Sequence, residues 1–73
     1  INIGRFASRF AAEKMLLRTA LSEMATLQGT QRKIIIQRSG YDANFVGLTR
    51  EGADLACRKL QARSINCLMI GPG

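Results

Sequence analysis

The hydrophobic periodicity of this 73-residue chain switches repeatedly between that of a strand and that of a helix, and this order constrains the fold more than any other feature. Strand-like stretches cover residues 2–6, 33–38, 41–46 and 66–70. Helical stretches run from Arg9, after a Ser8 cap, to about Leu27, and from a Thr49 cap to about Arg63. The chain therefore predicts the order strand, helix, strand, strand, helix, strand.

Each predicted helix carries a single apolar stripe and needs a sheet face to cover it. The first stripe comprises Leu16, Leu17, Ala20, Leu21, Met24 and Leu27, with Phe10 at its edge. The second comprises Ala53, Ala56, Cys57 and Leu60. We expect an α+β fold of order βαββαβ, in which a four-stranded antiparallel sheet of ferredoxin-like order carries two helices on one face. Residues 1–73 form one domain, expected to be a fragment of a longer protein.

Alternation along the strands divides their side chains between two faces of the sheet. The residues expected on the helix side are Ile3, Ile34, Ile36, Tyr41, Ala43, Phe45, Cys67 and Met69. Those expected on the open side are Asn2, Lys33, Ile35, Gln37, Asp42, Asn44, Asn66, Leu68 and Ile70. Such a mixed polar face suits a ligand rich in hydroxyl and amide groups, although a merely solvated face has the same composition.

Catalytic chemistry finds little support in the composition. The chain has no histidine, which removes the usual triads, general bases and zinc sites. The pattern brings no pair of its five acidic residues into a shared pocket, and no phosphate-binding glycine loop occurs. We therefore expect this domain to have no catalytic residues, no metal and no cofactor.

The charge balance favours an anionic partner. Eleven Lys and Arg residues against five Asp and Glu residues give a formal charge of +6. Nucleic acid, an anionic envelope polymer or a membrane surface would suit this charge, and so would a purely solubilising role. No apolar run approaches the ~20 residues of a membrane-spanning helix, so no membrane segment is expected.

The sequence resembles a sporulation-related repeat, or SPOR, domain in Ile-Asn-Ile-Gly-Arg-Phe (residues 1–6), Val-Gly-Leu (46–48) and the strand that carries Cys67. Residues 5–14 and 41–57 look most like one subset of the family, the C-terminal SPOR domain of bacterial D-alanyl-D-alanine carboxypeptidases. The resemblance covers essentially the whole chain.

This resemblance implies that the domain binds septal peptidoglycan, specifically glycan strands stripped of their stem peptides, and brings an attached enzyme to the division site. It also implies a location in the periplasm or outside the cell. The family binds glycan across the open sheet face, and its usual first strand reads Val-Gln-x-Gly-Ser-Phe. Asn2 stands at the Gln position and keeps an amide, whereas Arg5 replaces the small hydroxyl with several donors.

The expected glycan-binding residues are Asn2, Arg5, Asn44 and Leu68, with Tyr41 at the edge of the groove. A gapless match to one branch of the family puts Tyr41 on the ligand face, whereas alternation turns Tyr41, Ala43 and Phe45 inward. Tyr41 lies at a strand end, where either environment is open to it. The inward register makes Val46 an extra residue, in a bulge before Gly47.

In the oxidising setting that the resemblance implies, we expect a disulfide between Cys57 and Cys67, because periodicity places both on buried faces. The alternative is a pair of buried free thiols. Two alternatives to glycan binding share the predicted fold: a single-stranded RNA-binding module and a subunit-pairing module without a ligand. RNA binding is not expected, because the Lys/Arg-Gly-Phe/Tyr signature of RNA-recognition modules is absent. The pattern gives no oligomeric state.

Overall fold

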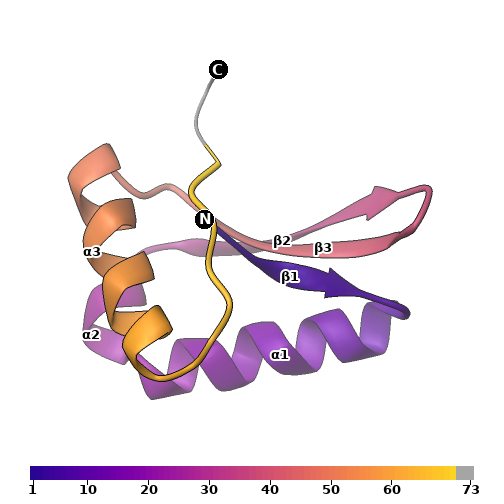
Figure 1. Ribbon diagram of the computed structural model, residues 1–73, viewed down its shortest axis with the longest axis horizontal. Helices are drawn as coiled ribbons and strands as arrows, with labels where there is room; N and C mark the ends of the chain where they lie inside the picture. The colour runs from indigo at the N-terminus through magenta and orange to yellow at the C-terminus, as the bar shows by residue number, and fades with distance from the viewer. Residues whose placement is uncertain (71–73) are drawn as a thin grey trace.

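The computed structural model describes residues 1–70 and confirms the α+β class, with three strands and three helices in the described part (Figure 1). The elements in chain order are β1 (Asn2–Phe6), α1 (Arg9–Ser22), α2 (Met24–Leu27), β2 (Gln31–Gln37), β3 (Gly40–Val46) and α3 (Arg50–Ala62). Both predicted caps are confirmed. The hydroxyl of Ser8 accepts from the Ala11 amide at 3.1 Å, and that of Thr49 accepts from the Gly52 amide at 3.0 Å.

The sheet is antiparallel throughout, with strand order β1-β3-β2. The Ser39-Gly40 pair is a turn signal that predicts a hairpin between the second and third strands. The structure confirms this hairpin, and Gln37 pairs with Gly40 across its two-residue turn. Glycine suits position 40, because an added Cβ would lie 2.7 Å from the carbonyl oxygen of Phe6.

The prediction of a fourth strand is wrong for the described residues. Over 66–70, only Leu68 pairs with the sheet, through two backbone hydrogen bonds of 2.8 Å to Asn2. Leu68, Met69 and Ile70 are exposed, so no packing extends the pairing into a ladder. Met69 therefore does not join the helix side, contrary to expectation. The segment still lies beside β1, where the ferredoxin-like order places a fourth strand.

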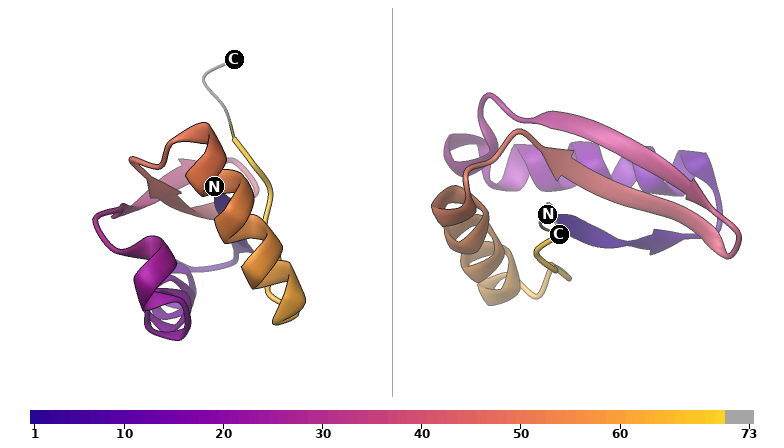
Figure 2. Two further views of the ribbon diagram at one scale, coloured as in Figure 1. Left: turned by 90° about the vertical axis from the view of Figure 1, so that its left-hand side faces the viewer. Right: turned by 90° about the horizontal axis from the view of Figure 1, so that it is seen from above.

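The two longer helices are placed differently from the prediction of both on one sheet face. α1 runs across one face of the sheet, whereas α3 stands against one end of it and packs on α2 (Figures 1 and 2). Buried residues from the strands, from α1 and from α3 form a single core. The largest fully enclosed hydrophobic side chains in this core are Phe45, Ile3, Leu16 and Leu60.

Strand alternation predicted the inner face of β3 correctly, since Ala43 and Phe45 are buried and Tyr41 packs against the core. Ile36 was expected on the same inner face. It pairs with Tyr41 there, but it is exposed near the end of the hairpin instead of buried.

The first predicted helix departs from expectation in its length and in its buried face. It breaks at Glu23, whose φ of −135° and ψ of 53° are not helical, and resumes as the short α2. The face of α1 that packs on the sheet carries Ala12, Leu16 and Thr19. The exposed members of the predicted stripe are Leu17, Leu21 and Met24, together with Phe10 at its edge, because α1 has apolar residues on two opposite sides.

Thr19 gives a first testable prediction. Its side chain is fully buried, and its hydroxyl oxygen has no hydrogen-bond partner among the described residues. Valine has nearly the same shape without the desolvated hydroxyl, so Thr19→Val should raise the free energy of unfolding by about 1 kcal/mol in denaturant titrations. Thr30→Val is the matched contrast and should be destabilising, because the Thr30 hydroxyl donates to the Leu27 carbonyl at 2.6 Å. A loss of stability in Thr19→Val would refute this account of the core.

Candidate functional site

A β-bulge in β1 determines which side chains reach the open face of the sheet. Asn2 pairs with Asn44 and Gly4 pairs with Ala43, so Ile3 and Gly4 together oppose Ala43. The extra residue places Asn2 and Arg5, three positions apart, on the same face. Regular alternation would have put them on opposite faces. Gly4 has a φ of +141°, a conformation that L side chains rarely adopt.

This bulge corrects the position predicted from the sequence. A bulge was expected at Val46, but Val46 pairs in register with Gln31. The irregularity lies instead in β1, the strand that pairs with β3. A glycine within a strand is the sequence signal that would have located it.

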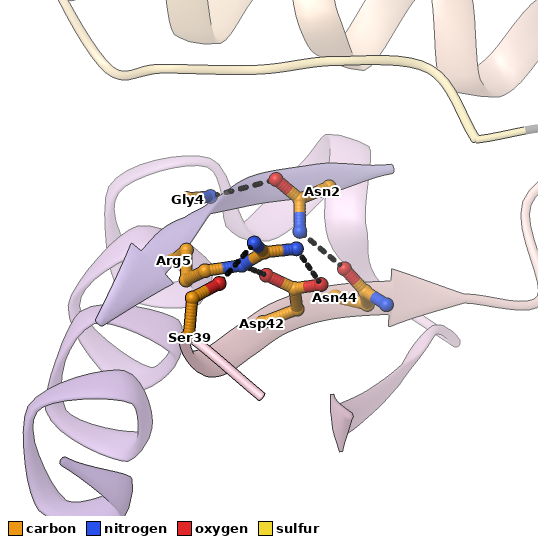
Figure 3. Close-up of polar contacts among 6 residues, drawn as sticks. All are labelled: Asn2, Gly4, Arg5, Ser39, Asp42 and Asn44. Carbon is orange, nitrogen blue, oxygen red and sulfur yellow. Dashed lines mark hydrogen bonds and ion pairs between the residues drawn. The ribbon is translucent and has the colours of Figure 1, made fainter. Parts of the chain in front are cut away.

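Asn2 and Asn44 form a hydrogen-bonded amide pair on the open face (Figure 3). The backbone amide of Gly4 donates to Asn2 Oδ1 at 3.0 Å, which leaves Asn2 Nδ2 to donate to Asn44 Oδ1 at 2.8 Å. This chain of bonds sets the orientation of both amides. Asn44 Nδ2 consequently points away from Asn2, and it donates no hydrogen bond to any of the described residues.

Arg5 lies beside this pair and is held by two neighbours that sequence reasoning missed. Its Nε and one terminal nitrogen donate to the two carboxylate oxygens of Asp42 at 2.7 and 3.1 Å. The other terminal nitrogen donates to the Ser39 hydroxyl at 2.6 Å (Figure 3). In the part of the chain that the structure describes, these three bonds leave two of the five guanidinium N–H groups without a partner. The Arg5 side chain is 49% exposed, so the remaining donors are accessible to a ligand.

The sequence could have identified Asp42 as the partner of Arg5 only if the bulge had been predicted as well. Asp42 was placed on the open face of β3, but without the bulge Arg5 would not have pointed toward it. The structure pairs the two residues directly across the strands. Ser39 belongs to the hairpin turn, and a turn signal does not indicate that its hydroxyl contacts another strand.

The other two expected site residues, Leu68 and Tyr41, lie in different parts of the fold. Leu68 is joined to Asn2 through its backbone, and its side chain is exposed. Tyr41 pairs with Phe6 and packs against the core, on the sheet face opposite to Asn2 and Arg5. The structure therefore brings Asn2, Arg5 and Asn44 together, with Leu68 next to them, and leaves Tyr41 on the other side.

The pKa of Asp42 provides a test of the Arg5 contact. Hydrogen bonds from Arg5, aided by its positive charge, hold the pKa of Asp42 below its ordinary value. The pair therefore stabilises the fold above the pKa of Asp42 in the unfolded chain, and this contribution is lost as pH falls through the lowered pKa. Arg5→Gln should raise the pKa of Asp42, measured by NMR titration of its carboxyl carbon. An unchanged pKa would show that the contact is absent in solution.

The fold and its open face define a small α+β domain with an ordered row of hydrogen-bond donors on an antiparallel sheet. Within residues 1–70, no cluster of three or more His, Cys, Asp or Glu residues is arranged to hold a metal ion. None of the helices in this range is long and apolar enough to cross a membrane. No protein-family model, curated protein or solved structure matches the chain.

Proposed function

We propose that this domain binds peptidoglycan, in particular glycan strands without stem peptides, through the open face of its sheet, as a SPOR-like domain would. The observation that carries the proposal is the row formed by Asn2, Asn44 and Arg5, whose side chains are oriented by hydrogen bonds within the protein. On this proposal the domain brings an attached cell-wall enzyme, such as a D-alanyl-D-alanine carboxypeptidase, to the division site.

The chemistry of the row suits a glycan. One N–H of Asn2, two of Asn44 and two of Arg5 have no partner among residues 1–70, so the hydrogen-bonding capacity left in this row consists mainly of donors. Sugar hydroxyls and acetamido carbonyls offer the matching acceptor oxygens. Asp42 balances the positive charge of Arg5, which favours an uncharged partner over a phosphate at this point. Leu68, exposed at the edge of the row, offers an apolar surface to a sugar ring.

The disulfide supports an extracytoplasmic location. The structure joins Cys57 to Cys67, as predicted, with their Cα atoms 5.3 Å apart. Such bonds form and persist in oxidising compartments and are rare in the cytosol. The periplasm, where peptidoglycan lies, meets this condition, and we assign the domain to it as part of the proposal.

The arrangement of the aromatic residues argues against RNA as the ligand. RNA-recognition modules stack bases on exposed aromatic side chains of the open face. Among the described residues, Tyr41 and its partner Phe6 lie on the face toward α1, Phe45 is buried, and Phe10 belongs to α1. The described strands thus offer no aromatic platform on the open face.

The test compares purified sacculi before and after digestion with an amidase that removes stem peptides. The chain should sediment with both preparations and bind more to the digested one. A single-stranded RNA pool serves as the competing ligand, and Gln28→Ala, an exposed amide between α2 and β2, serves as the control variant. Equal binding to both sacculus preparations, or preferential retention of RNA, would refute the proposal.

A further inference from the structure

α1 carries a second apolar stripe, turned away from the sheet. Phe10, Leu17 and Leu21 on α1, continued by Met24 on α2, are 74, 52, 63 and 63% exposed. At about 100° per residue, the three α1 positions fall within a narrow arc opposite Ala12, Leu16 and Thr19, which pack on the sheet. Exposed apolar side chains gathered in this way mark interaction sites on soluble proteins.

Positive charge surrounds this stripe. Lys14 and Arg18 lie along one side of it, exposed and without an ion pair among the described residues. On the other side, Arg9 is 3.9 Å from Glu13, the one acidic residue of α1. Next to the stripe, a groove of about 400 Å³ between α1 and β2 adds Arg32. The surface around the stripe thus carries four cations against one carboxylate.

The shape and charge of this surface indicate which kind of partner can cover it. A second copy of the chain would bring like charges together, since the whole chain has a net charge of +6. A protein partner ordinarily covers ~800 Å² on each side, whereas this stripe consists of four side chains in a single row. A bilayer needs no complementary groove. It accepts apolar side chains that are flanked by basic residues, whose long side chains carry the charge to the lipid headgroups.

We propose that α1 docks the domain on an anionic lipid bilayer, with Phe10, Leu17 and Leu21 inserted at the headgroup boundary and Lys14 and Arg18 on the lipid phosphates. This inference goes beyond glycan binding and does not depend on it. α1 covers one face of the sheet (Figure 1). Asn2, Arg5 and Asn44 lie on the other face, because Ala43 and Phe45, which alternate with Asn44, face the core. A domain bound to lipid through α1 therefore keeps its proposed glycan face turned away from the membrane.

The test measures co-sedimentation of the chain with vesicles of phosphatidylcholine, alone or mixed with phosphatidylglycerol. Binding should require phosphatidylglycerol and fall at least fivefold in the Leu17→Ser/Leu21→Ser variant. Leu55→Ser is the matched control, since Leu55 is 50% exposed on α3, and it should bind like the parent chain. Lys14→Gln/Arg18→Gln should also weaken binding, and Phe10→Trp should shift its emission to the blue on vesicles.

Three results would overturn the inference. The parent chain could fail to bind the anionic vesicles, or Leu17→Ser/Leu21→Ser could bind as well as the parent. Sedimentation equilibrium without lipid could instead show self-association that this variant abolishes, which would assign the stripe to a second copy. The same variant should still bind amidase-treated sacculi, so the failure of lipid docking is distinguishable from the failure of glycan binding.

Discussion

Replacing both cysteines by alanine, as Cys57→Ala/Cys67→Ala, is expected to lower the free energy of unfolding by about 2–3 kcal/mol. The disulfide closes a short loop between residues that are 10 positions apart, and its loss restores conformational freedom to the unfolded chain. It also fixes the segment in which Leu68 pairs with Asn2. In a 73-residue domain this loss is a large share of the total stability.

Denaturant titration of the parent and the double-alanine chain measures this effect, and a reduced parent chain serves as the control. Intact mass after alkylation without a reductant gives an independent check. The native chain should take up no alkyl group, because both sulfurs are in the disulfide. Two alkylated thiols, or equal unfolding midpoints for the two chains, would contradict the prediction.

The Asn2→Ala/Asn44→Ala variant should bind denuded glycan about 30-fold more weakly than the parent, if each amide contributes about 1 kcal/mol. The sequence places both side chains on the open side of the sheet, where they would face water, and therefore predicts that neither change unfolds the domain. The structure shows instead that Asn44 is only 7% exposed. The double variant removes both members of this hydrogen-bonded pair, and the backbone amide of Gly4 loses its acceptor, Asn2 Oδ1. Because neither side-chain amide is left without its partner, we predict that the domain still folds.

A double-mutant cycle distinguishes what the Asn2 and Asn44 amides contribute to glycan binding from what they contribute to stability. Asn2→Ala alone leaves Asn44 Oδ1 without its donor, so each single variant should lose more stability per amide removed than the double variant does. Gln28→Ala is again the control and should leave binding unchanged. Unchanged glycan affinity in the double variant, with its thermal midpoint intact, would show that the ligand binds elsewhere.

Local signals in the sequence predicted local structure well. Ser8 and Thr49 cap the helices because their hydroxyls satisfy free amides of the first turn. The turn signal at Ser39 and Gly40 predicts the hairpin, whose turn is formed by Arg38 and Ser39, and the alternation of Ala43 and Phe45 specifies the inner face of β3. These features depend on a few neighbouring residues and a single period.

Features that depend on distant partners could not be predicted in the same way. The row on the open face exists because the bulge at Ile3 and Gly4 shifts Arg5 toward Asp42, and no local period reports such a register. α1 has apolar residues on opposite sides, so its periodicity could not tell that Leu16 would be buried and Leu17 exposed. The last segment has strand-like residues, but strand formation there requires packing that it lacks.

The most direct test of glycan binding by the open face is an NMR titration of the ¹⁵N-labelled chain with soluble glycan oligomers lacking stem peptides. We predict that the largest shift changes fall on the backbone amides of Asn2, Arg5 and Asn44, on the Asn2 and Asn44 side-chain amides and on Arg5 Nε. The amides of Leu17 and Leu21 on α1 should not move. Shift changes centred on α1 or α3, or none at saturating oligomer, would contradict the account.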